Sequence, residues 1–169
     1  MKFTEIPQMT KSKYRVNVSW DFLKEHLRRY KKSFNFDLNP DFQRDFIWTH
    51  QQKIDYIEYI LKGGISGRDI FLNHPNWMGS FEGNLVIVDG KQRIQAVLDF
   101  LDDKIPAFSH LYSEFEDGLP FSGPDFIFNV NDLKDKKEIL QWYIDLNTGG
   151  TSHTNEEIHK VQKMIKDEK

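Results

Sequence analysis

The chain has 169 residues, 38% of them hydrophobic, with 14 Phe, 6 Tyr and 4 Trp. This length and apolar content predict one compact domain spanning residues 1–169. The chain contains no cysteine, which excludes disulfides, a thiolate nucleophile, zinc-thiolate sites and iron–sulfur clusters. The formal net charge of −3 excludes a broadly basic coat for nucleic acid.

Short apolar runs and a weakly apolar N-terminus argue against a membrane protein. The longest runs, such as residues 85–88, contain four apolar residues or fewer, whereas a bilayer-spanning helix needs about 20. The N-terminus also lacks the apolar core of a signal peptide. We therefore expect a soluble, cytoplasmic protein.

Positive charge is concentrated at the N-terminal end of the chain. Residues 1–50 contain 10 Lys and Arg against 6 Asp and Glu, a balance of +4. Much of this excess comes from five residues: Lys24, Arg28, Arg29, Lys31 and Lys32. They could contact nucleic-acid phosphates without regard to sequence. They could equally form a solvated helix face.

The first half of the chain alternates strand and helix patterns. In order, these predict a strand over 14–18, a helix capped by Ser19 and ending near Tyr30, a strand over 34–38, and a helix opened by the capping box of Thr49 and Gln52 and ended by Gly63 and Gly64. Strands over 70–72 and 85–88 follow. The second of these is a continuous apolar run, which favours a central position in a sheet.

The second half begins with a strand, a turn and a helix in direct succession. The predicted elements are a turn at Asp89 and Gly90, a helix with Ile94, Val97, Leu98 and Leu101 on its core face, loops with a strand over 126–130, and helices over 133–147 and from a capping box of Thr154 and Glu157. The fold class is therefore α+β (mixed α/β), with a small mixed sheet and flanking helices.

The junction at residues 88–93, Val-Asp-Gly-Lys-Gln-Arg, carries the strongest functional signal. Unpaired N–H groups at a helix start form an anion site, which Lys91 and Arg93 could complete around phosphate. Asp89 could bind a divalent metal or act as a base. A purely structural interpretation also stands, with Asp89 as a helix cap, Gly90 as a turn residue and Arg93 as an ion-pair partner.

Two further segments contain polar residues next to aromatic residues or glycines. Residues 42–48, Phe-Gln-Arg-Asp-Phe-Ile-Trp, offer Arg44 for bidentate recognition of phosphate. Trp48 could pack in the core or stack on a nucleic-acid base. In residues 145–150, Asp-Leu-Asn-Thr-Gly-Gly, the glycines indicate a helix end, while Asn147 and the downstream Glu156 could donate oxygen ligands to a metal.

These three segments, in this order, resemble the signature blocks of the ParB/sulfiredoxin-like superfamily. The nearest branch is the N-terminal domain of GmrSD-type modification-dependent restriction enzymes, with the pattern Y-Q-R-x-Y-x-W, then D-G-Q-Q-R-L, then L-N-x-G-G and a downstream glutamate. The resemblance covers about residues 36–162. Gln43 and Arg44 match the first block, Asp89, Gly90, Gln92 and Arg93 the second, and Asn147 the third.

The resemblance implies an α/β domain that binds Mg²⁺ and a nucleoside triphosphate and transfers or hydrolyses phosphate in DNA-related settings. It implies that Gln43, Arg44, Gly90, Gln92 and Arg93 bind the nucleotide, that Asp89, Gln92, Arg93 and Arg44 take part in catalysis, and that Asp89, Asn147 and Glu156 bind the metal. Lys91 could add a further contact to the phosphates of the nucleotide. Lys91 departs from the family's glutamine, and Asp145 stands where a basic residue is common.

The leading hypothesis is thus an NTP-dependent phosphoryl-transfer enzyme, either an NTPase or a kinase for a hydroxyl of a modified DNA base. The chain lacks the family's additional nuclease domain, so we expect no DNA cleavage. The rival hypothesis is a non-catalytic module, either a nucleotide-switched DNA-binding protein or a regulatory or anti-defence protein. DNA, with plain or modified bases, is the expected partner, and a homodimer is a further expectation.

Overall fold

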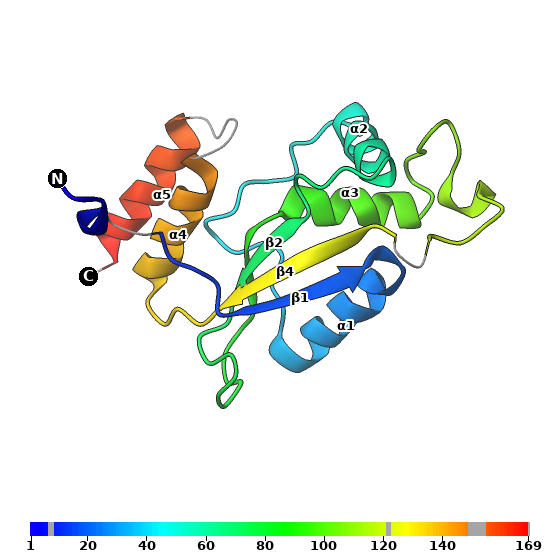
Figure 1. Cartoon of the computed structure of the whole chain (residues 1–169). Helices are drawn as coiled ribbons and strands as arrows, with labels where there is room; N and C mark the ends of the chain where they lie inside the picture. The colour runs from blue at the N-terminus through cyan, green and yellow to red at the C-terminus, as the bar shows by residue number, and fades with distance from the viewer. Residues whose placement is uncertain (7–8, 121–122, 149–154, 169) are drawn as a thin grey trace.

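The computed structural model describes residues 1–6, 9–120, 123–148 and 155–168. Within them a four-stranded sheet is accompanied by five α-helices (Figure 1). The elements are β1 (Tyr14–Ser19), α1 (Leu23–Phe34), α2 (His50–Leu61), β2 (Asp69–Asn73), β3 (Val86–Asp89), α3 (Lys91–Leu101), β4 (Asp125–Asn131), α4 (Lys136–Thr148) and α5 (Asn155–Asp167). The predicted mixed α+β class is confirmed.

The sheet has the strand order β1-β4-β2-β3 and mixed pairing. β4 pairs antiparallel with β1 and parallel with β2, and β2 pairs antiparallel with β3. In register, Val16 lies opposite Phe128, which lies opposite Ile70. Because neighbouring residues in register share a face, these side chains belong to one side of the sheet.

That side of the sheet faces the main hydrophobic core. Phe128, Ile70 and Ile87 are completely buried there, together with apolar residues from α1, α2 and α3. The opposite side packs against α4 and α5, where Val88 and Trp142 are buried in a second cluster. Figure 1 shows α4 and α5 side by side at one end of the molecule, and the loop after α3 at the other end. None of the described helices is long and apolar enough to cross a membrane.

β3 occupies a sheet edge, so the predicted central position is wrong. Its continuous apolar run has another cause: Leu85 and Ile87 enter the main core, while Val86 and Val88 face the second cluster. Both faces of β3 are therefore buried, because helices cover each side of the sheet. The outer edge is covered locally by Asp37, whose amide donates to the carbonyl of Leu85 and whose carbonyl accepts from Ile87.

The strand predicted over 34–38 is also wrong. Phe34 is the last residue of α1, and Asn35 ends the helix in the left-handed conformation with φ 45°. Only an isolated bridge at Asp37 remains of the expected strand. The alternation of Phe34 and Phe36 arises because both side chains pack in the main core, one from the helix end and one after the turn.

Two helix boundaries differ from expectation and one is confirmed. Ser19 precedes a 3₁₀ turn, Trp20–Phe22, without a side-chain cap, and α1 begins at Leu23. α4 starts at Lys136, three residues later than predicted. The capping box of α2 is confirmed, because Thr49 Oγ1 accepts from the Gln52 amide and Gln52 Oε1 accepts from the Thr49 amide. The capping box predicted at Thr154 lies outside the described residues.

Candidate functional site

The candidate site lies where β3 leads into α3. Gly90 joins the two with φ 106°, a left-handed conformation that favours glycine. A Cβ at this position would lie 2.4 Å from Ile70 Cδ1 and 3.3 Å from Ile70 Cα. Among the described residues, no side chain caps α3 at Gly90. The sharp turn thus starts α3 against the sheet and leaves its first N–H groups without a side-chain cap.

A cavity of about 70 Å³ opens at this junction, and we call it the Asp89 cavity. It brings the three sequence blocks together in space, although they are far apart along the chain. Its lining residues are Gln43, Arg44, Trp48, Asp89, Gly90, Lys91, Gln92, Arg93, Tyr143 and Asn147. The first two blocks supply eight of these residues, and α4 supplies Tyr143 and Asn147.

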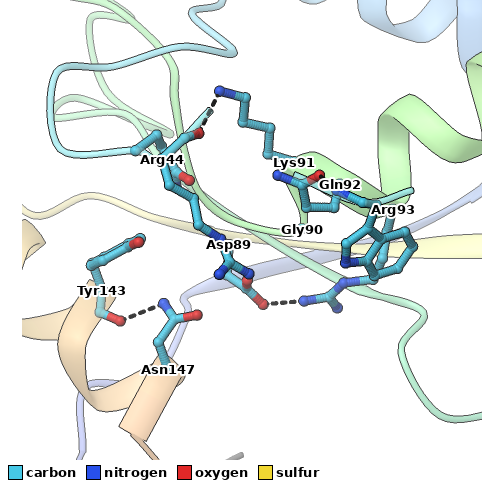
Figure 2. A pocket seen from close by; sticks show the side chains of 10 residues that line it. Arg44, Asp89, Gly90, Lys91, Gln92, Arg93, Tyr143 and Asn147 are labelled. Atoms are coloured by element: carbon cyan, nitrogen blue, oxygen red, sulfur yellow. Dashed lines mark hydrogen bonds and ion pairs between the residues drawn. The ribbon is translucent and has the colours of Figure 1, made fainter. Parts of the chain in front are cut away.

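Asp89, the last residue of β3, forms an ion pair with Arg93 in the first turn of α3, four residues later. The side chains are 23% and 19% exposed, respectively. Arg93 Nη1 also donates to the backbone carbonyl of Asp69 over 2.6 Å, which ties the guanidinium to the start of β2. In Figure 2, Arg44 points toward Asp89 from the other side. One carboxylate is therefore flanked by two arginines, which makes the wall of the cavity predominantly cationic.

Gln92 has a structural role at the edge of the cavity. Its Nε2 donates to the carbonyl of Asp45 over 2.9 Å, and its Oε1 accepts from the amides of Ile47 at 3.1 Å and Trp48 at 3.2 Å. The amide group therefore uses both its oxygen and its nitrogen to hold the segment that carries Arg44. Its predicted roles in binding phosphate and in catalysis remain untested.

Gln43 and Lys91 also make backbone contacts. Gln43 Nε2 donates to the carbonyls of Val88 at 2.7 Å and Ile87 at 3.3 Å, on the outer edge of β3. Lys91 Nζ donates to the carbonyl of Arg44 at 2.8 Å and lies 4.3 Å from the Phe46 ring centroid. Burial lowers the pKa of Lys91. Figure 2 shows its ammonium group directed away from Asp89.

Asn147 enters the cavity from α4. Its Nδ2 donates to the carbonyl of Tyr143, one turn earlier, at 2.6 Å. Figure 2 shows the side-chain oxygen on the side facing Asp89. The other predicted metal ligand, Glu156, belongs to the first turn of α5, but its side chain lies outside the described residues. Within the described part of the chain, no group of three His, Asp or Glu residues is placed to hold a metal ion.

Of the predicted nucleic-acid residues, only Trp48 reaches the Asp89 cavity. Trp48 lines the cavity but is half-buried, and its ring packs against Tyr56 at 5.3 Å between centroids. The basic cluster on α1 does not line the cavity. Lys24 pairs with Asp102, just beyond the C-terminal end of α3 and so away from Asp89, and Arg28 pairs with Glu25 on α1 itself.

Sequence reasoning missed Tyr143 and Asp69. Tyr143 is 2% exposed and lines the cavity next to Asn147. Its position four residues before Asn147 was the available signal, since residues one helical turn apart share a face. Asp69 contributes a backbone carbonyl to Arg93, and no side-chain pattern signals such a contact.

The fold and site define a small α+β domain with a cationic cavity at a strand-to-helix turn, framed by the Asp-Gly-Lys-Gln-Arg sequence. The family model of the GmrSD restriction endonuclease, N-terminal domain, matches residues 23–126, more than half of the chain. The chain belongs to this family. The match includes the first two sequence blocks and stops before the third. No curated protein and no solved structure matches significantly.

Proposed function

We propose that the Asp89 cavity binds phosphate groups of a nucleoside triphosphate and that the protein uses them in phosphoryl transfer connected with DNA. The observation that carries this proposal is the pair of arginines beside the start of α3, where no side chain of the described residues caps the helix. Guanidinium groups and helix N-terminal N–H groups are standard partners of phosphate. Membership of a restriction-endonuclease domain family supports the DNA setting.

Arg93 retains donors for a ligand despite its internal contacts. A guanidinium has five N–H donors, and its hydrogen bonds to Asp89 and Asp69 use two of them. These two contacts fix the plane of the guanidinium before any ligand arrives. A preorganised charge of this kind stabilises a transferring phosphoryl group without reorganisation.

The size of the cavity limits what it can enclose. Its volume of about 70 Å³ would hold roughly five water molecules, so a phosphate group suits it better than a whole nucleotide. A neighbouring hollow of about 60 Å³ shares Gln43, Arg44 and Tyr143 with it and is also lined by Lys160. Successive phosphates would follow this cationic track, with the nucleoside outside it.

The oxygen donors in the cavity suit Mg²⁺ only if the nucleotide provides most of the ligands. Asp89 and Asn147 supply a carboxylate and an amide oxygen, and Mg²⁺ commonly takes one or two protein ligands together with phosphates and water. When bound, the metal would neutralise charge on the phosphate oxygens. Asp89 would then be shared between the metal and Arg93.

In the proposed reaction an acceptor oxygen forms a bond to the γ-phosphorus while the bond to the β–γ bridging oxygen breaks. The nucleoside diphosphate leaves with that electron pair, and Arg44 and Arg93 neutralise the developing charge. The acceptor loses its proton to Asp89 or to solvent. Water as acceptor makes the protein an NTPase, and a hydroxyl on an extruded DNA base makes it a kinase.

The rival proposal is a non-catalytic module in which nucleotide binding alone changes affinity for DNA or for a protein partner. The structural roles of Gln92 and Lys91 favour this rival, since the side chains at two positions of the motif bond to backbone carbonyls within the chain. A regulatory or anti-defence protein belongs to the same class. The homodimer and the cytoplasmic location stay predictions.

An assay with γ-labelled ATP, Mg²⁺ and duplex DNA containing plain or hydroxymethylated bases separates these proposals. The enzyme proposal expects free labelled phosphate or labelled DNA, and binding without turnover of any triphosphate would establish the rival. Arg93→Ala and Arg44→Ala should abolish nucleotide binding, whereas Lys32→Ala on α1 should preserve it. Equal losses in all three variants, or no binding by the folded wild-type protein, would contradict the cavity as the nucleotide site.

A further inference from the structure

A second, larger pocket lies at the opposite end of α3. It has a volume of about 230 Å³ and is formed by the end of α2, the end of α3 and the loop that follows. We call it the aromatic pocket, and its lining residues are Leu61, Phe100, Phe108, Tyr112, Phe115, Asp117, Gly118, Leu119 and Pro120. Phe100 follows Arg93 by seven residues, about 10 Å along the helix axis. The two cavities share no residue.

Aromatic rings form several walls of this pocket at steep angles to one another. The ring of Phe100 lies at 74° to that of Tyr112, with centroids 5.4 Å apart, and at 80° to that of Phe115, with centroids 6.1 Å apart. Phe108 and Phe115 remain 41% and 37% exposed at the surface. Phe100 is only 1% exposed and packs edge-to-face against Tyr112 and Phe115, so rings of different orientation line the pocket and Phe108 and Phe115 are its more open walls.

The loop around the pocket is strongly acidic. Residues 102–117 contain five acidic residues and one lysine, a balance of −4 if histidine is neutral. Asp117 lines the pocket itself, and neither it nor Glu116 has an ion-pair partner among the described residues. Negative charge at the rim repels phosphate, so this pocket is unsuited to a nucleotide or an extruded DNA base.

A cation already lies against one of the aromatic walls. Lys62 Nζ is 5.2 Å from the ring centroid of Phe108, within the range of a cation–π contact. The lysine side chain is 65% exposed, so the contact is not forced by burial. The same ammonium group lies 4.0 Å from Glu58 Oε2, so a carboxylate and the face of Phe108 together hold a cation at the rim.

The shape of the pocket is fixed by contacts within the chain. Glu58 of α2 accepts a hydrogen bond from the Phe108 amide at 2.8 Å, and Asp103 accepts one from the Ser113 amide at 2.9 Å. Phe108 and Ser109 are both held at positive φ, 51° and 65°, which is unfavourable for non-glycine residues. The loop therefore bears backbone strain at Phe108, a lining residue of the pocket, and such strain is common at binding sites.

We propose that the aromatic pocket binds a quaternary or methylated ammonium group. Perpendicular ring faces attract a diffuse cation through their quadrupoles, and the methyl groups of such a cation fill apolar space that a hydrated ammonium would leave. Asp117 supplies the opposing charge. The group could belong to a small molecule or to a methylated lysine side chain, which present the same chemistry to the pocket.

Titrations followed by amide ¹H–¹⁵N spectra of the whole chain test this proposal. The probes are choline, its neutral carbon isostere 3,3-dimethylbutan-1-ol, and a short peptide carrying one trimethyllysine. We expect shifts at residues 100–120, with the cation bound roughly tenfold more tightly than the isostere. Choline binding identifies a small-molecule site, and binding of the peptide alone identifies a protein partner.

Two variants test whether the preference for the cation arises in the aromatic pocket. Tyr112→Leu removes one wall and should abolish the preference for the cation, while Phe22→Leu, at an aromatic residue that is 68% exposed and outside the pocket, should preserve it. The spectrum of each variant reports whether it remains folded. Equal affinity for choline and the isostere, shifts outside residues 100–120, or no shifts with either cation would overturn the proposal.

Discussion

Gln92, the second residue of α3, donates a hydrogen bond from its side chain to the backbone carbonyl of Asp45 at 2.9 Å. The side-chain oxygen of Gln92 also accepts hydrogen bonds from the backbone amides of Ile47 and Trp48, which follow Asp45 closely in the chain. A helix residue thus sets the path of a loop without regular structure. The position of Arg44 beside the Asp89 cavity depends on this contact.

Replacing Gln92 with leucine should destabilise the protein and weaken its site. The substitution removes the side-chain amide of Gln92 and leaves its backbone partners in the loop without a hydrogen bond from this side chain. This should lower the free energy of unfolding by about 1–3 kcal/mol. Urea denaturation measures this loss. The matched control is Gln141→Leu, because exposed Gln141 donates to Asp145 in its own helix, and this is its one side-chain hydrogen bond among the described residues. An equal effect of the two substitutions would contradict the role given to Gln92.

A second prediction is that Lys91 contributes less to nucleotide binding than Arg44 and Arg93 do. Its ammonium group is held by the Arg44 carbonyl and the Phe46 ring, so Lys91→Met should change nucleotide affinity by less than Arg93→Ala does. We expect a small change in stability, because methionine removes one hydrogen bond and also the cost of a buried charge. Isothermal titration with ATP and Mg²⁺ provides the comparison. A larger loss of affinity for Lys91→Met than for Arg93→Ala would instead indicate that Lys91 contacts the phosphate directly.

The sequence predicted which blocks would form the site, but it could not predict how each side chain is used. Asp89, Arg93 and Arg44 meet in one cavity, as the blocks indicated. Gln92 and Lys91 donate to backbone carbonyls. Every residue has a backbone carbonyl, so the sequence does not show which one a side chain will contact. Likewise, the apolar pattern located β3 correctly but could not distinguish a central strand from an edge strand covered on both faces.

Gly90 offers a test of the turn that positions Asp89. Alanine at φ 106° is strained, and its Cβ would approach Ile70 Cδ1 to 2.4 Å and Ile70 Cα to 3.3 Å. The side-chain end can move, but the backbone of β2 cannot move as easily. We expect Gly90→Ala to lower the free energy of unfolding by more than about 1 kcal/mol.

The control for this test is Gly118→Ala, since a Cβ at Gly118 meets no atom within 4 Å and its φ is not positive. Thermal unfolding of both variants measures the difference. If Gly90→Ala is as stable as Gly118→Ala, the turn does not require glycine.

The last prediction concerns pH and the ion pair that joins α2 to α3. Lys53 Nζ lies 2.6 Å from Asp99 Oδ2, and both side chains are nearly buried, at 13% and 10% exposed. Burial alone would raise the pKa of Asp99, but hydrogen bonds from Lys53 and Gln95 outweigh it, and the pKa is lowered from its ordinary 3.8. The folded protein therefore binds this proton more weakly than the unfolded chain does.

It follows that Asp99 contributes its full stabilisation above its ordinary pKa, and that this contribution is lost as the pH falls through the folded-state pKa. Lys53→Met removes the closer of two cations beside this buried carboxylate, since Lys104 Nζ also lies 3.6 Å from Asp99 Oδ1. The loss of this charged hydrogen bond should cost about 1.5–3 kcal/mol at neutral pH, and the difference from wild type should shrink below pH ~4. Lys24→Met, which breaks a half-exposed pair with Asp102, should cost less than about 1 kcal/mol. Urea unfolding across this pH range distinguishes the two, and a Lys53→Met deficit that stayed constant with pH would mean that the loss comes from packing rather than from charge.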